Sequence, residues 1–295
     1  MAKQYYYFVT GLSNIGFDDT KQALTPRAFF EEAALKLNDS DMKLLKLLYL
    51  PQDLDNLLRI LFHKDQDLLS GSMISAEDWQ ALIDFIKPNP DNEQRLKPPI
   101  YKQIPAFIVE HCTEFLALEA EQVYLDWETR FLKSFYEYTG SHANRFIREW
   151  FMFNRDIKNI LSALNGREFD YPFAEYLLGE GEWIEKLAKS QASDFGLGKQ
   201  YPLFESVYRI YDQYGIVDRE RNYDALRWRW IDNQNFFQYF NIDRILGYFC
   251  KLCIIDRWMN LELENGKEIF FDTLDKLENS FSFPEEFDLK QKVKQ

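Results

Sequence analysis

The sequence predicts an all-α protein, and three observations lead to that fold class. First, the chain holds only 12 Gly and 10 Pro among 295 residues, so material for turns is scarce. Second, 26 Phe, 17 Tyr and 7 Trp bring the aromatic fraction to 17%. Third, apolar residues recur at three- and four-residue steps along most of the chain, which is the spacing of one helix face. Bulky side chains with few breakers favour long packed helices. Residues 5–10 could form a strand or begin a helix.

Four helices are expected before residue 88. Thr25 is a capping residue followed by proline, so a helix should begin there and run to Leu37. A second helix is expected over residues 38–49, and Pro51 begins a third that ends near residue 62. Ser75, with an acidic residue three positions later, predicts a fourth helix that ends near residue 86.

The central part of the chain contains the best candidate linker and its longest helical pattern. Residues 88–99 hold four prolines and predict a linker. Residues 106–139 contain no Gly or Pro and predict either one helix of unusual length or two in series. After Gly140, the helical period continues as far as Asn165 and Gly166, a pair typical of a helix end.

The last third begins with a choppy region and then becomes helical again. Glycines separate short helical pieces over residues 171–198. Helices are expected from Pro202, over residues 223–240 and over residues 242–263. A final helix is expected over residues 267–278, followed by a frayed tail at residues 290–295.

Charge and cysteine content exclude several classes of protein. The formal net charge of −13 excludes a general nucleic-acid binder, because binding to phosphates needs a basic surface. Three cysteines and no signal-peptide pattern indicate a reducing compartment, so we expect a cytoplasmic protein. The longest apolar stretch, residues 245–255, is interrupted by Lys251 and is too short to span a bilayer.

No motif nominates a catalytic residue, a cofactor or a metal. His63, His111 and His142 lie far apart, and Cys250 and Cys253 fall inside an apolar helical run without a second cysteine pair. Glycine-rich phosphate loops are missing. The carboxylates between residues 110 and 128 are interpreted as a solvated helix face, although a helical-bundle enzyme could use such carboxylates to hold metals.

A short basic and aromatic cluster is the one candidate for partner contact. It consists of Arg227, Trp228, Arg229 and Trp230, in a chain that is otherwise acidic. The cluster could meet an anion or an acidic helix. Arginine stems packed over the tryptophan rings would explain it equally well.

An internal repeat divides the chain into three helical units. The pattern Asp-x-x-Asn-aliphatic occurs at Asp53 and Asn56 and again at Asp156 and Asn159, at a spacing of about one hundred residues. A third copy, one residue longer, pairs Asp256 with Asn260. The predicted units cover residues 1–99, 100–201 and 202–295. Asp and Asn at these positions are expected to cap and cross-link helices, because their side chains satisfy free backbone donors.

The order and spacing of these motifs resemble the C-type subunit of the bacterial and archaeal V/A-type ATPases, which is named the d-type in the eukaryotic vacuolar enzyme. The matching positions are Asp53, Asn56 and Leu57 in the first unit and Asp156, Asn159 and Ile160 in the second; near the end, Phe240, Asn241, Ile242, Asp243, Tyr248, Lys251, Asp256, Asn260 and Leu261 are similar to the family's last long helix. Residues 5–9 also look like the start of an uncharacterised bacterial family associated with V-type ATPase gene clusters. The chain departs from the pattern of the C-type family at residues 10–12, Thr-Gly-Leu, where an Arg-Leu-Arg run is typical.

The resemblance implies a helical funnel with pseudo-threefold symmetry and a mechanical function. Members of that family link the central stalk to the membrane rotor ring, so that ion translocation is coupled to ATP hydrolysis or synthesis. The resemblance therefore implies a non-catalytic protein, one copy per complex, peripheral to the cytoplasmic face of the inner membrane. Its partners would be stalk and ring subunits, with no nucleic acid and no cofactor. The alternative is a general helical adaptor that binds partner helices.

Overall fold

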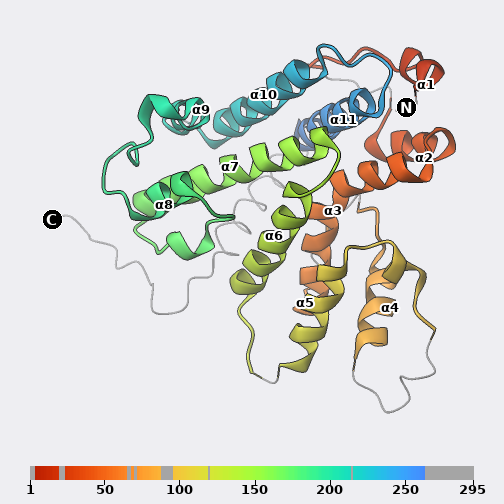
Figure 1. Ribbon diagram of the computed structural model, residues 1–295, viewed down its shortest axis with the longest axis horizontal. Coiled ribbons are helices and arrows are strands. Elements are labelled where there is room, and N and C mark those ends of the chain that lie inside the picture. Colours follow the sequence, from red (N-terminus) through yellow and green to blue (C-terminus); the bar gives the residue numbers. More distant parts are fainter. Residues whose placement is uncertain are drawn as a thin grey trace.

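The described part of the chain is all-helical, as the composition predicts. The computed structural model describes residues 4–19, 24–64, 68–69, 72–87, 96–118, 120–213 and 215–262, and these contain eleven α-helices, three short 3₁₀ helices and no strand (Figure 1). The α-helices are α1 (Tyr6–Thr10), α2 (Pro26–Lys36), α3 (Asp39–Leu61), α4 (Ala76–Ile86), α5 (Ala106–Ala117), α6 (Tyr124–Gly140), α7 (Arg145–Glu168), α8 (Glu182–Lys189), α9 (Pro202–Tyr211), α10 (Ile216–Asn235) and α11 (Ile242–Glu262).

The N-terminal signals act as expected at α2 and α4 but not at Pro51. Thr25 and Ser75 accept hydrogen bonds from the third residue after them and so cap α2 and α4. The sequence predicts two helices over residues 38–62, yet α3 is continuous with Pro51 inside it. Proline removes one helix hydrogen bond. Here buried leucines before and after Pro51 hold the helix together, so packing overrides the break signal.

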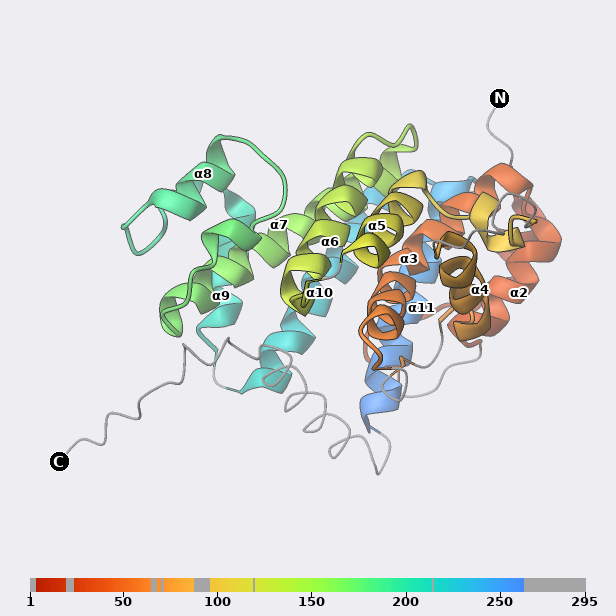
Figure 2. The same ribbon diagram turned by 90° about the horizontal axis from the view of Figure 1, so that it is seen from below.

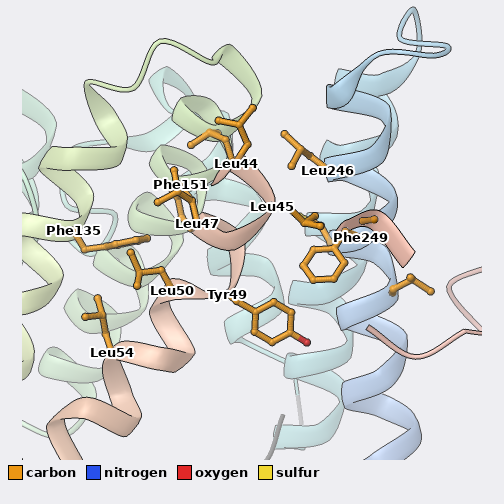
Figure 3. Close-up of a cluster of buried hydrophobic side chains, with 14 of the residues drawn as sticks. Leu44, Leu45, Leu47, Tyr49, Leu50, Leu54, Phe135, Phe151, Leu246 and Phe249 are labelled. Carbon is orange, nitrogen blue, oxygen red and sulfur yellow. The ribbon is translucent and has the colours of Figure 1, made fainter. Parts of the chain in front are cut away.

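Helix α3 forms the centre of the larger hydrophobic core. Figure 3 shows Leu45 beside Phe249 of α11, and Leu47 and Leu50 on the side where Phe135 of α6 and Phe151 of α7 lie. The core therefore draws on all three predicted units. A division of the chain into units of residues 1–99, 100–201 and 202–295 stays a prediction, as does their pseudo-threefold relation.

The long pattern over residues 106–139 is two helices. Residues 118–123 separate α5 from α6, and the two helices lie side by side (Figure 1). His111 joins them, because its Nε2 is 2.8 Å from Ser134 Oγ and its ring meets Phe131 edge-on. Of the two structures that the sequence allows for residues 106–139, the protein therefore has two helices, and they form an antiparallel pair.

Helix α7 passes the expected stop at Asn165 and Gly166 and continues to Glu168. Gly166 is buried inside the helix, and a Cβ there would lie 2.2 Å from the Phe173 ring. The glycine thus makes room for an aromatic ring instead of ending the helix. Beyond Phe151, α7 enters a second and smaller core that it shares with α8 and α9 at one end of the molecule (Figure 2).

Helices α10 and α11 form a close hairpin across Gly247. A Cβ at Gly247 would lie 1.8 Å from Asn235 Nδ2 and 2.9 Å from Ile231 Cγ2, so a larger residue would displace these two side chains of α10. The helix expected over residues 223–240 begins earlier, at Ile216, and ends at Asn235. Residues 236–241 connect α10 to α11. Asn241, the last of them, caps α11, because its Oδ1 accepts a hydrogen bond from Arg244 N.

Some expectations fall on residues that the structure does not describe. The helix predicted over 267–278, the tail 290–295 and most of the linker at 88–99 lie outside the described residues. Residues 5–10 form a helix start, α1, rather than a strand. Among the described helices, none has the length and apolar character needed to cross a bilayer.

Candidate functional site

The first Asp-x-x-Asn motif holds the chain segment that leads into α4. Asn56 Oδ1 accepts a hydrogen bond from Leu69 N at 2.7 Å, and its Nδ2 donates to Leu69 O at 3.1 Å. Asp53 Oδ1 accepts from Ser72 Oγ at 2.5 Å, Met73 N at 2.9 Å and Ile74 N at 3.1 Å. Both side chains project from inside α3, so they cap the segment before α4 rather than their own helix. We call this arrangement the first clamp.

The second motif repeats the amide contact but not the carboxylate contact. Asn159 accepts from Leu178 N and donates to Leu178 O, both at 2.8 Å, and we call this the second clamp. Asp156 instead binds its neighbour Arg155: its Oδ1 accepts hydrogen bonds from Arg155 Nε at 2.9 Å and from Arg155 Nη2 at 2.8 Å. Burial raises the pKa of both Asp53 and Asp156. Three hydrogen bonds partly offset the rise at Asp53, and the Arg155 charge does so at Asp156.

The third copy of the motif makes no contact between segments within the described residues. Asn260 Nδ2 donates to Asp256 Oδ2 at 3.2 Å, one turn back on α11. Burial raises the pKa of Asp256, and the Asn260 hydrogen bond lowers it. The structure places this pair near the end of α11, and the chain that follows, from residue 263, is outside the described residues.

The family relation of the chain comes from its sequence as a whole. A family profile described as "Protein of unknown function (DUF2764)" matches residues 1–281. The chain belongs to the DUF2764 family. No curated protein and no solved structure matches the chain.

Three asparagines start the three longest described helices of this DUF2764 chain. Asn38, Asn144 and Asn241 accept hydrogen bonds from the backbone N of Asp41, Ile147 and Arg244, and so cap α3, α7 and α11. The sequence places Asn38 at a helix start and Asn241 near the start of the last long helix. Asn144 carries the same signal, an Asn before an apolar helical run, which the sequence interpretation missed.

The three helix starts lie together. Tyr5 links two of them, because its hydroxyl accepts from Asn38 Nδ2 at 3.0 Å and its backbone N donates to Phe240 O at 2.6 Å. Asn144 Nδ2 donates to Asp243 Oδ1 at 3.0 Å, which ties the start of α7 to the first turn of α11. We call this meeting point the helix-start junction.

Exposed aromatic side chains surround one side of the helix-start junction. Tyr7 is 96% exposed and Phe237 is 76% exposed, values unusual for large apolar groups. The Tyr6 and Phe240 rings stand 4.6 Å apart, which joins α1 to the turn between α10 and α11. This set, which we call the aromatic surface, consists of the exposed Tyr6, Tyr7, Phe236, Phe237 and Tyr239 and the half-buried Phe240.

The basic and aromatic cluster at residues 227–230 is mostly engaged inside the protein. Arg227 donates to Asn154 Oδ1 at 2.8 Å, and Trp228 is buried against Phe17. Trp230 packs on Phe146, Trp150 and Phe153 of α7. Arg229 alone among the four is exposed, so the structure uses this cluster chiefly to join α10 to its neighbours.

Asp224 is a buried carboxylate that the sequence interpretation missed. Arg227 donates to its Oδ1 at 3.0 Å, and Trp258 Nε1 donates to its Oδ2 at 2.8 Å. Arg257 also donates to Oδ2. A buried charge needs such partners, and here they join α10 to α11. Its i, i+3 spacing from Arg227 was the available signal.

The residues considered for metal or redox chemistry do not gather. Within the residues that the structure covers, no three His, Cys, Asp or Glu side chains are arranged as metal ligands. Burial raises the pKa of the Cys253 thiol to about 12 and that of Cys250 well above its ordinary value. Both therefore stay protonated and unreactive near neutral pH. His142 Nδ1 accepts from Asn144 N, a local structural contact.

Proposed function

We propose that this protein is a non-catalytic coupling component of a V/A-type rotary ATPase. It would link the central stalk to the membrane rotor ring at the cytoplasmic face of the inner membrane. The observation that carries the proposal is the helix-start junction. The three longest described helices each begin at a capping asparagine. A direct hydrogen bond joins the starts of α7 and α11, and Tyr5 links the start of α3 to the residue before Asn241. Three comparable helical units are what the resemblance to the C-type family implies.

The packing of the chain suits a part that transmits torque. Each of these three helices is buried along much of its length. The rings of Tyr49 on α3 and Phe249 on α11 pack 5.3 Å apart, and Phe151 of α7 meets Phe135 of α6. Close-packed interiors have low compressibility, so a force applied at one end reaches the other with little loss. The aromatic surface offers a contact for a partner protein, since aromatic residues are enriched in protein interfaces.

Affinity purification from the native host would test this function. A tagged copy should bring down stalk and ring subunits from gently solubilised membranes, identified by mass spectrometry. Enrichment of neither class over a tag-only control would contradict the proposal. Phe236→Ser with Phe237→Ser should reduce recovery severalfold if the aromatic surface makes the contact. Tyr208→Ser, an exposed aromatic on α9, is the matched control and should leave recovery unchanged.

The second candidate is a general helical adaptor, which the same aromatic surface favours. Exposed rings beside the helix-start junction could receive the apolar face of a partner helix. In that case the tagged protein would recover a stable partner outside the rotary complex, and the Phe236→Ser and Phe237→Ser pair would abolish its binding.

A further inference from the structure

A small pocket lies in the second core, beside the second clamp. Its volume is about 100 Å³, well below the roughly 300 Å³ at which small-molecule sites begin. A pocket of this size accepts one side chain and not a whole metabolite. It is lined by Asp156 and Ile160 of α7, Trp183 of α8, Leu197, and Tyr201 and Phe204 at the start of α9.

The carboxylate on the pocket wall has an unused oxygen. Arg155 occupies Oδ1 of Asp156, and within the described chain no hydrogen bond reaches Oδ2. The equivalent residue of the first clamp, Asp53, accepts three hydrogen bonds from its own chain. Asp53 is 2% exposed, whereas the Asp156 side chain is 26% exposed and lines a pocket, so only the Asp156 carboxylate can be reached from outside.

The remaining walls of the pocket suit an alkylammonium group, which has a positively charged end and an apolar methylene stem. Trp183 and Tyr201 have ring centroids 6.4 Å apart and inclined by 35°, and aromatic faces attract cations. Ile160 and Leu197 supply apolar contact for a methylene stem. Carboxylate, ring faces and apolar walls together match a long aliphatic side chain that ends in a positive charge.

We propose that this pocket binds a lysine side chain presented by a partner protein. Lysine is favoured over arginine because Oδ1 is already taken by Arg155. A guanidinium binds best to two carboxylate oxygens, whereas an ammonium needs one. The net charge of −13 also favours a basic partner surface. The inference does not rest on the rotary ATPase proposal, since it follows from the pocket and the net charge of the chain.

Titration of the full-length protein with model side chains would test the proposal. The probe is N-acetyl-lysine amide, and the signal is the indole resonance of Trp183 in protein labelled with ¹⁵N-tryptophan, assigned with Trp183→Phe. We expect a saturable shift with a dissociation constant on the order of 1 mM, as for one small group. N-acetyl-norleucine amide has the stem without the charge and should bind at least fivefold more weakly. N-acetyl-arginine amide should also bind more weakly.

Variants separate the carboxylate from general charge. Asp156→Asn should weaken lysine binding at least fivefold, and Glu77→Gln on α4 should not change it. Equal binding of the norleucine and lysine probes to the wild-type protein would overturn the proposal without any variant. Retained binding in Asp156→Asn, or tighter binding of the arginine probe, would overturn it too. If free butylammonium bound with micromolar affinity, the pocket would be a site for a small free amine, and the proposal that it binds a lysine of a partner protein would be wrong.

Discussion

The first and second clamps use the same sequence pattern for different ends. In both, the asparagine binds the backbone N and O of one leucine, at Leu69 and at Leu178. The aspartates differ: Asp53 holds the segment before α4, whereas Asp156 faces the pocket of the second core. The comparison teaches that the amide contact is the shared structural element. In the second clamp no backbone N–H of the loop after Leu178 bonds to Asp156 within the described residues, so its carboxylate remains able to bind another group.

Loop length explains the divergence. The first loop returns to the motif with Leu69, 13 residues after Asn56, and its next residues bind Asp53. The second returns with Leu178, 19 residues after Asn159, and the following chain enters α8 past Gly181. Gly181 has a φ of 128°, a conformation that favours glycine, and α8 begins directly after it, so that Trp183 and not a backbone N–H comes to the pocket of Asp156.

Removing the amides should produce the largest effect and should differ between the clamps. Asn159→Ala leaves the N–H and C=O of Leu178 unpaired, and Leu178 is 1% exposed. We expect a loss of about 2–6 kcal/mol in the free energy of unfolding, because each of the two unpaired buried groups costs about 1–3 kcal/mol. Asn56→Ala should cost about 1–2 kcal/mol, since Leu69 is 38% exposed and water replaces the amide. Urea unfolding followed by far-UV circular dichroism measures both.

A control distinguishes this asymmetry from a general intolerance of the helices to alanine. Asn222→Ala on α10 removes an amide bound to Gln213 and should change the free energy of unfolding by about 0.5 kcal/mol or less. Equal losses at Asn56 and Asn159 would show that solvent access to the leucine does not set the cost.

For the aspartates, we expect the larger loss of stability in the first clamp, the reverse of the order expected for the asparagines. Asp53→Ala removes three hydrogen bonds at a residue that is 2% exposed and should cost about 2–4 kcal/mol. Asp156→Ala removes only the pair with Arg155 and should cost about 1 kcal/mol. Thermal unfolding of both variants makes the comparison. Asp53→Asn keeps an acceptor oxygen and should recover part of the loss, and a larger loss at Asp156 than at Asp53 would break the contrast.

The sequence was sufficient for the fold class and for the positions of these motifs. Aromatic content, scarce glycine and helical periodicity led to an all-helical chain, and Thr25 and Ser75 located two helix starts by their hydrogen-bonding chemistry. Helical periodicity and helix caps depend on residues only a few positions apart, so they can be predicted from the sequence.

What the sequence could not supply depends on contacts between distant segments. Pro51 and Gly166 are break signals, yet buried leucines flank Pro51 inside α3, and Gly166 lies inside α7 where it makes room for the Phe173 ring. Neither the unused oxygen of Asp156 nor the aromatic walls near it follow from Asp-x-x-Asn, because Trp183 and Tyr201 reach the pocket through the fold. The sequence left two interpretations open for the cluster at residues 227–230, partner contact and internal packing, and only the fold shows that its rings pack against α7 and Phe17.

The smallest expected effect concerns how pH acts on the two aspartates. Burial raises the pKa of both above the ordinary 3.8, so the folded protein holds each proton more tightly than the unfolded chain does. The free energy of unfolding therefore falls as the pH rises from 3.8 through the raised pKa, and stays lower above it. Asp53→Asn and Asp156→Asn remove this titration. Between pH 4 and pH 7, the difference in stability between each variant and the wild type should shift in favour of the variant.

Salt should separate the two aspartates in this experiment. The Arg155 charge lowers the pKa of Asp156, and at 1 M salt, where the Debye length is about 3 Å, that charge is partly screened. The pKa of Asp156 then rises further, so the relative gain of Asp156→Asn should grow by tenths of a kcal/mol, on the order of a partly exposed ion pair. Hydrogen bonds lower the pKa of Asp53, so its gain should stay constant. Thermal melts at both pH values with and without salt measure this, and equal salt responses would mean that both carboxylates are held in the same way.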